Sequence, residues 1–179
     1  MRIIITDSYE RMGLEAANIV AGQIYLKPDS VLGLATGSTP LSLYRRLIAV
    51  HETVGLDFSS VTTFNLDEYI GMAPDSPQSY HYFMHEHFFD HINIRPENIH
   101  LPSGIAEDMV AEGRRYEDMI ARAGGIWVCA PARRNSTGTM FDAPSPISRN
   151  PARATGATGT LSSTTKPATA TSPPPSKVR

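Results

Sequence analysis

The sequence predicts an α/β fold with a mostly parallel sheet and helices on both of its faces. Short apolar runs alternate with longer segments of helical periodicity across residues 1–130. The run at 31–35 is apolar throughout, which is typical of a strand buried on both faces. Strands and helices that alternate at this spacing form βαβ units, so the predicted arrangement is Rossmann-like. Because the pattern stops near residue 130, we expect the C-terminal part of this fold to be missing or disordered.

The first predicted elements are a strand, a helix and a second strand. Three isoleucines at 3–5 indicate a short buried strand. Asp7, with Glu10 three residues later, has the pattern of a helix start, and apolar residues then recur at helical spacing. The Lys-Pro-Asp segment at 27–29 ends this helix before the strand at 31–35.

The following elements continue the alternation. Thr39 is expected to cap a helix that has Pro40 at its first position. The β-branched run at 61–65 predicts a third strand, and Ser76, followed by a proline, has the pattern of another helix cap. The remaining predicted elements are a helix behind Ser76 that runs to 88, a strand at 99–101, a helix at 106–122 and a strand at 126–129.

Composition limits the classes of function. The net charge of −2 gives no argument for a nucleic-acid or membrane partner. The single cysteine, Cys129, cannot form an internal disulfide or a cysteine metal cluster. The N-terminal apolar run is too short for a signal peptide, and no segment approaches the length of a membrane span. A reducing cytoplasm is the simplest expected location.

The last 49 residues differ sharply from the rest. Residues 131–179 contain eight prolines, sixteen Ser or Thr, seven Lys or Arg and one acid, Asp142. Such a segment cannot bury enough apolar surface to offset its ordering entropy. We therefore expect two parts: an α/β domain at 1–130 and a disordered tail at 131–179.

The loop after the second strand is the first candidate binding site. Thr36, Gly37, Ser38 and Thr39 combine a glycine that permits close backbone approach with hydroxyls and a following helix N-terminus, which suits an anion such as phosphate. A capped strand-to-helix turn explains the same residues without a ligand. The spacing of nucleotide-binding glycine motifs is absent, so a nucleotide is not expected.

The segment after the third strand carries the second candidate. Asp67 and Glu68 stand side by side where the strand ends. An aspartate is ionised at neutral pH and can accept a proton as a general base. A solvated acidic turn or a carboxylate capping the next segment is the alternative.

Four histidines in the segment 81–91, in and just after the helix predicted behind Ser76, suggest a third idea. His81 and His85, like His87 and His91, stand four residues apart, which is a metal-binding spacing on a helix. The two pairs face different directions and no further ligand completes a site. Surface or interface histidines are therefore the favoured interpretation.

Taken together, these segments resemble the glucosamine-6-phosphate deaminases. The resemblance rests on "LGLATGSTPLSLYRRL", "TFNLDEYIGM", "SYHYFMHEHFFDHINIRPENIHLPSG" and "YEDMI", in this order over about residues 1–126. It implies conversion of glucosamine 6-phosphate to fructose 6-phosphate and ammonia in amino-sugar (N-acetylglucosamine) catabolism, without a metal or organic cofactor. It also implies that Asp67 removes the substrate's C2 proton and that residues 36–39 bind its phosphate, while Glu68 is a structural neighbour or a secondary contact.

Two alternatives to a deaminase remain open at this point. The 6-phosphogluconolactonases resemble the deaminases in sheet and sugar-phosphate loop. A non-catalytic sugar-phosphate-binding domain would also fit. In each case the partner is a small sugar phosphate, and a homo-oligomer is left open.

The resemblance stops after the fifth predicted strand. It implies a ring-opening histidine and a glutamate there, but the last histidine of the sequence is His100 and the only later acid beyond Asp118 is Asp142. We hypothesise that the tail is a frame-shifted translation: codons for Phe-Phe-Asp-Asp-Glu-Ala, read one base later, give the "SSTTKP" of 162–167. A natural disordered tail on a divergent paralogue is the alternative. In either case, we expect this chain to be a truncated deaminase with impaired activity.

Overall fold

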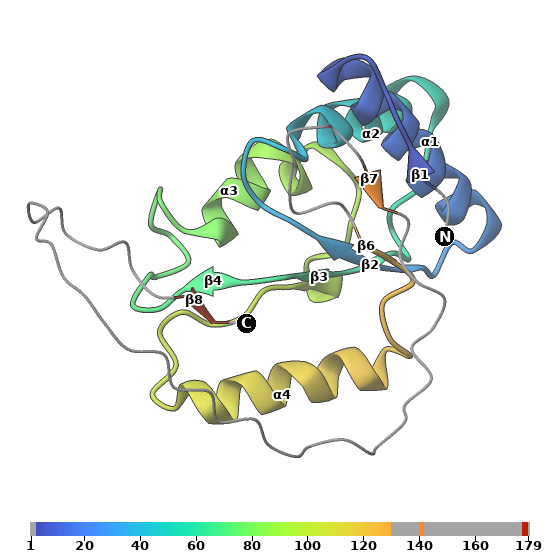
Figure 1. Ribbon diagram of the computed structural model, residues 1–179. Helices are drawn as coiled ribbons and strands as arrows, with labels where there is room; N and C mark the ends of the chain where they lie inside the picture. The colour runs from blue at the N-terminus through green and yellow to red at the C-terminus, as the bar shows by residue number, and fades with distance from the viewer. Residues whose placement is uncertain (1–2, 130–139, 142–176, 179) are drawn as a thin grey trace, which may run out of the picture.

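The computed structural model describes residues 3–129, 140–141 and 177–178. Its centre is a sheet of four parallel strands in the order β5-β3-β2-β6 (Figure 1). These strands are β2 (Val31–Leu34), β3 (Thr62–Asn65), β5 (Ile99–His100) and β6 (Val128–Cys129). Every neighbouring pair runs parallel. The predicted α/β class is confirmed.

Helices cover both faces of this sheet, as predicted. Figure 1 shows α1, α2 and α3 on one face and α4 on the other. These helices are α1 (Tyr9–Leu26), α2 (Leu41–Val54), α3 (Tyr80–His87) and α4 (Met109–Arg122). Short 3-10 turns at Phe89–His91 and Pro96–Asn98 complete the helical segments.

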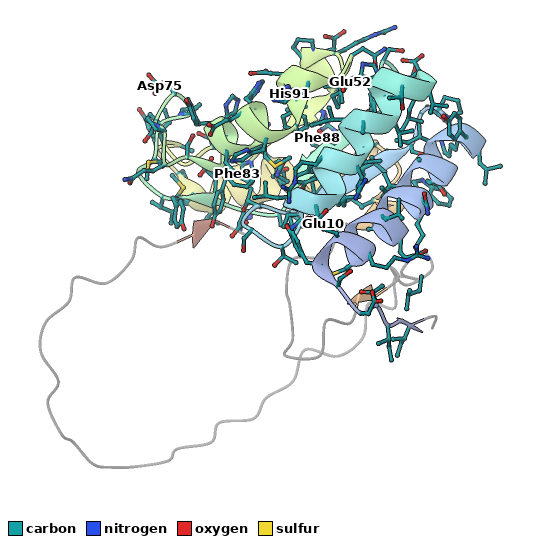
Figure 2. The ribbon with its side chains drawn as sticks, turned by 90° about the horizontal axis from the view of Figure 1, so that it is seen from above. Glu10, Glu52, Asp75, Phe83, Phe88 and His91 are labelled. Atoms are coloured by element: carbon teal, nitrogen blue, oxygen red, sulfur yellow. The ribbon has the colours of Figure 1, made fainter. Side chains whose placement is uncertain are left out.

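Two apolar clusters hold the layers together. The larger lies between the sheet and the three-helix layer, and it includes Phe88, which is labelled in Figure 2. Phe88 stacks on Tyr44 with ring centroids 4.8 Å apart. The smaller joins Val31 and Phe64 to Tyr116 of α4. Side chains alternate between the faces of a strand. Because Phe64 faces α4, its neighbour Asn65 faces the three-helix layer.

The strand after the first helix behaves as its composition predicts. All four residues of β2 are buried, which agrees with a central strand covered on both faces. The third strand begins one residue later than predicted, at Thr62.

Three predicted helix caps are wrong by one to three residues. The cap of α1 is Ser8, not Asp7, because Ser8 has an extended backbone and its hydroxyl accepts from the Arg11 amide at 3.2 Å. Likewise Ser79, not Ser76, caps α3 by accepting from the Tyr82 amide at 2.9 Å.

The third misplaced cap lies at the start of α2. Thr39 does not cap this helix, because the capping position is Pro40, which makes no side-chain hydrogen bond to the first amides. The backbone of Pro40 is already helical, with φ −82° and ψ −4°. The start of α2 therefore depends on contacts with other elements.

The first predicted strand also needs correction. Residues Ile3–Ile4 form β1, but β1 pairs antiparallel with β7 (Met140–Phe141) outside the four-stranded sheet (Figure 1). Ile3 is 48% exposed and Ile5 is 77% exposed, so the prediction of a buried strand is wrong. A strand is buried only where helices cover both of its faces, and β1 lies outside those layers.

The later elements agree with the sequence, with shorter bounds. The helix predicted at 106–122 begins at Met109, because the Asp108 carboxylate caps it by accepting from the amides of Val110 and Ala111. A further short strand, β4 (Glu68–Tyr69), pairs antiparallel with β8 (Lys177–Val178). The predicted disordered tail, apart from β7 and β8, lies outside the described residues. No helix within the described ranges is long and apolar enough to cross a bilayer.

Candidate functional site at the carboxyl edge of the sheet

The two candidate loops leave the sheet from directly opposed residues. Leu34, the last residue of β2, is the register partner of Asn65, the last residue of β3. The amide of Leu66 continues this pairing by donating to the carbonyl of Leu34 at 3.2 Å. Adjacent strands lie about 4.8 Å apart. The sheet therefore brings together two loops separated by thirty residues of sequence.

The loop at 36–39 is fixed to α1 by Tyr9. The Tyr9 hydroxyl donates to the carbonyl of Ser38 and accepts from the amide of Ser42 at 3.0 Å. The Ser42 hydroxyl donates back to the Tyr9 carbonyl at 3.3 Å. A Cβ on Gly13 would collide with Ser42, so this glycine permits the close approach of α1 and α2.

Part of the loop at 36–39 is exposed, so a ligand could reach it. Gly37 and Ser38 are exposed, whereas Thr36 and Thr39 are half-buried. Gly37 has φ +95°, a conformation that favours glycine over other residues. The loop is therefore a held turn with an exposed tip, which is compatible with both the anion site and the simple turn.

The second loop places its two carboxylates differently. Asp67 is half-buried at the carboxyl edge, whereas Glu68 is only 2% exposed. One oxygen of Glu68 accepts from the amides of Tyr69 at 2.9 Å and Tyr80 at 3.0 Å. Its other oxygen accepts from the amide of His81 at 3.0 Å. Glu68 thus binds the N-terminus of α3, which is the structural role expected of it.

A third loop, after β5, supports the segment around Asp67. The amide of Gly71 donates to the carbonyl of Gly104 at 2.7 Å. A Cβ on Gly104 would lie 2.7 Å from the carbonyl oxygen of Met72 and closer still to that of Tyr69. Only glycine fits against this backbone.

That third loop is in turn anchored to α4. The buried Glu112 carboxylate accepts from the amide of Ser103 at 2.8 Å and forms a two-point contact with Arg115 at 2.6 and 2.7 Å. The hydrogen bond from Arg115 holds the pKa of Glu112 below its usual value, with a smaller contribution from the Ser103 amide. The Asp67 segment is therefore held from α3 and, through two loops, from α4.

Tyr116 connects the ends of two strands. Its hydroxyl lies 2.8 Å from the carbonyl of Asn65 and 2.9 Å from that of His100, so one donor serves β3 and β5. Burial is the main cause that raises the pKa of Tyr116 well above its ordinary value of about 10. The hydroxyl stays protonated and continues to donate at any ordinary pH.

The helical histidines are engaged in local contacts. The rings of His81 and His85 stack with centroids 4.8 Å apart, and His85 Nδ1 lies 2.8 Å from an oxygen of Asp90. Burial, reinforced by His85, lowers the pKa of His81. His91 pairs with the carbonyl of Glu86. No group of three or more His, Cys, Asp or Glu within the described residues is arranged to hold a metal ion.

Sequence reasoning predicted the two loops but not their supports. Tyr9 and Gly104 had no pattern that distinguished them. Glu112 and Tyr116 lie within the helix predicted at 106–122, but no pattern indicated the contacts that they make. The adjacent Asp-Glu pair was the one signal that pointed to Glu68.

The fold and these loops define a class of protein: an open parallel α/β sheet with its candidate ligand site beyond the carboxyl ends of two adjacent strands. Residues 9–142 match the family described as glucosamine-6-phosphate isomerases/6-phosphogluconolactonase. The chain belongs to this family, and the resemblance drawn from its motifs is confirmed.

Within this family, the chain is similar to curated glucosamine-6-phosphate deaminases. The chain is 60% identical over 126 residues to a glucosamine-6-phosphate deaminase from Thermoanaerobacter sp. (strain X514), covering 70% of this chain and 50% of the relative. It is 52% identical over 126 residues to glucosamine-6-phosphate deaminase 2 of Bacillus subtilis (strain 168), covering 70% and 51%. The chain therefore spans about half the length of the curated relatives it matches.

Solved structures agree on the fold. A monomeric glucosamine-6-phosphate deaminase superposes with a TM-score of 0.71 at 45% identity, covering 72% of this chain and 54% of that one. The 6-phosphogluconolactonase of Thermotoga maritima gives a TM-score of 0.54 at 23% identity, covering 66% and 52%. The second likeness supports the fold alone.

Proposed function

We propose that this chain is a glucosamine-6-phosphate deaminase by descent. In the proposed reaction, glucosamine 6-phosphate and water give fructose 6-phosphate and ammonia by an aldose–ketose isomerisation coupled to hydrolytic deamination. The observation that carries the proposal is the pairing of Leu34 with Asn65, which places a carboxylate loop beside a loop suited to phosphate. The names of relatives at up to 60% identity support the same activity. Amino-sugar catabolism in the cytoplasm is the corresponding role.

The proposed roles follow from the positions of the two loops. Thr36, Gly37, Ser38 and Thr39 bind the phosphate, with the exposed tip at Gly37 and Ser38 in contact with it. Asp67 takes the proton from C2 of the open-chain sugar, which leaves an enolate, and protonation of its oxygen gives a neutral enolamine. A proton added at C1 then gives a C2 imine, which water hydrolyses to the ketone and ammonia. The Asp67 segment is held by Glu68 and Gly104, so the carboxylate keeps its place during the transfer. The proposal requires neither a metal nor an organic cofactor.

We expect weak turnover from this chain. The family resemblance implies a ring-opening histidine after the fifth strand, yet the sequence has no histidine after His100. A closed sugar ring does not present the acidic C2 proton that Asp67 would remove. Binding should therefore survive better than catalysis.

The test separates binding from chemistry. Calorimetric titration with glucosamine 6-phosphate measures binding, ammonia release measures turnover, and deuterium incorporation at C2 in D₂O measures proton abstraction alone. Asp67→Asn should lower deuterium incorporation by about 10²- to 10⁴-fold while binding changes little. Asp75→Asn, an exposed aspartate at the periphery of the same region (Figure 2), is the matched control and should change neither. Failure of the unaltered chain to bind the sugar phosphate would refute the proposal.

A non-catalytic sugar-phosphate-binding domain is the second candidate. The absence of a histidine after His100 favours it, because the loops could bind the ligand without completing the reaction. Binding without any deuterium incorporation would identify this function. Hydrolysis of 6-phosphogluconolactone in a substrate panel would instead identify a lactonase.

Both proposed loops come from a single chain. The solved deaminase of highest structural likeness described above is itself a monomer. Light scattering of the purified chain measures whether a homo-oligomer forms.

The tail beyond residue 130 has its own proposal. We retain a shift of reading frame as the origin of residues 131–179. Resequencing the gene around codons 126–135 tests it, and a confirmed in-frame reading of the present tail would exclude it.

A further inference from the structure

Asn65 carries a buried side-chain amide that has no partner among the described residues. The residue is 1% exposed, and neither Oδ1 nor Nδ2 has a hydrogen-bond partner within the part of the chain that the structure describes. Buried polar side chains in native proteins nearly always have a partner, so an orphaned amide requires an explanation. Its own backbone is well held, since the Asn65 carbonyl accepts from Tyr116. The missing partner concerns the side chain alone.

The position of this amide is the second observation. Asn65 is the last residue of β3 and is paired with Leu34, after which the loop at 36–39 begins. Asp67 follows two residues later. By the alternation of β3, the amide faces the three-helix layer rather than α4, where Phe64 packs. The amide thus stands at the junction of the two loops to which we assign phosphate binding and proton abstraction.

We propose that the Asn65 amide is a substrate-binding group that hydrogen-bonds a hydroxyl of the sugar between its phosphate and C2. The amide offers one acceptor and two donors, which suits a hydroxyl that both gives and receives a proton. Because the amide is covered in the ligand-free chain, the contact forms in a bound state in which the adjoining loop at 36–39 shifts. This inference rests on the proposed function, since it assumes a sugar phosphate in the same site.

The proposal predicts an unusual combination of effects. An unpaired buried amide costs folding stability, so replacing it with an apolar group of similar shape should stabilise the ligand-free chain. The same replacement should weaken binding of the sugar. Binding sites commonly show such an exchange of stability for function. An asparagine already satisfied inside the protein would give the opposite sign of stability change.

The experiment compares Asn65→Leu with Thr63→Val. Thr63 lies on the same strand and face and is also fully buried, but its hydroxyl has a partner in the carbonyl of Asn98. We expect Asn65→Leu to raise the melting temperature by about 3 °C and Thr63→Val to leave it unchanged or lower it. Asn65→Ala, measured by binding alone, is a second variant that removes the amide without adding volume.

Binding is measured with glucosamine 6-phosphate and with inorganic phosphate. Asn65→Leu should weaken the sugar phosphate about five- to tenfold, the equivalent of one lost hydrogen bond, and should leave inorganic phosphate unchanged. Thr63→Val should change neither affinity. These differences locate the lost contact on the sugar rather than on the phosphate.

The outcomes are separable. A lower melting temperature for Asn65→Leu, or unchanged binding of the sugar phosphate by both Asn65 variants, overturns this inference and leaves the proposed function standing. Equal weakening of both ligands overturns it as well. If the unaltered chain binds no sugar phosphate, the proposed function and this inference fail together.

Discussion

Replacing Glu68 with glutamine removes one oxygen from a buried carboxylate that serves three amide donors. Its two oxygens accept from Tyr69, Tyr80 and His81, all between 2.9 and 3.0 Å. Glutamine keeps one acceptor oxygen, which can still serve Tyr69 and Tyr80. Its NH₂ group would then face the amide of His81, placing a donor against a donor.

The size of the effect can be worked from these contacts. A hydrogen bond to a charged group contributes about 1.5–3 kcal/mol, and a negative charge at a helix N-terminus adds about 0.3–1 kcal/mol. Relief of the buried charge offsets part of this loss. We expect Glu68→Gln to lower the free energy of unfolding by about 2 kcal/mol, and Glu68→Ala, which leaves both α3 amides without an acceptor, to lower it further.

Urea unfolding measures this loss, and amide hydrogen exchange locates it. Exchange at Tyr80 and His81 should accelerate in Glu68→Gln, because these amides lose part of their protection. Glu86→Gln is the matched control: its side chain lies on the same helix but is 57% exposed, so its effect should stay within about 0.5 kcal/mol. The reasoning would be refuted if Glu68→Gln were no more destabilising than this control.

The further predictions concern Gly104, which lies against the backbone after Asp67, and Tyr116, which joins the ends of β3 and β5. Gly104→Ala should lower the free energy of unfolding by about 3 kcal/mol or more, because its Cβ would meet the carbonyl oxygens of Tyr69 and Met72. Gly113→Ala, on α4 with open space around its Cβ position, should instead raise it by about 0.5–1 kcal/mol, and chemical unfolding of both variants checks the sign. Burial raises the pKa of Tyr116 in the folded chain. The contribution of Tyr116 to the free energy of unfolding is therefore complete below the unfolded-state pKa of about 10 and is lost as the pH rises above it. Tyr116→Phe should remove this loss of stability, and unfolding curves at pH 9 and pH 11 measure it. The same loss between these two pH values in Tyr116→Phe and in the unaltered chain would contradict the role given to Tyr116.

Local patterns in the sequence predicted much of the fold. The run Val31–Leu34 consists of apolar residues and glycine, and it forms the central strand, because burial on both faces selects such residues. The order of helices and strands through Val128–Cys129 follows from the same periodicity. Caps were placed less well, because several Ser, Thr and Asp residues stand near each helix start and only the backbone conformation decides which one binds the amides.

The supports of the candidate site were beyond sequence reasoning. Periodicity predicts which residues share a face of one helix or strand, but it does not predict contacts between different segments. Two such contacts join Gly104 to Met72 and Glu112 to Ser103. The three isoleucines at 3–5 are a further example of a feature that local sequence does not decide. Their composition predicts a buried strand, but their burial depends on which elements cover them.

The sequence by itself determined the class of the fold, the family and the two loops that carry the candidate chemistry, because these depend on local periodicity and on motifs contiguous in the chain. Only the tertiary structure decided that the loops start from paired residues, that Glu68 holds α3 while its neighbour stays at the edge, and that the buried Asn65 amide has no partner among the residues that the structure describes. The physical reason is that partnership and burial are properties of residues brought together by folding, and no local pattern records which distant group will be there.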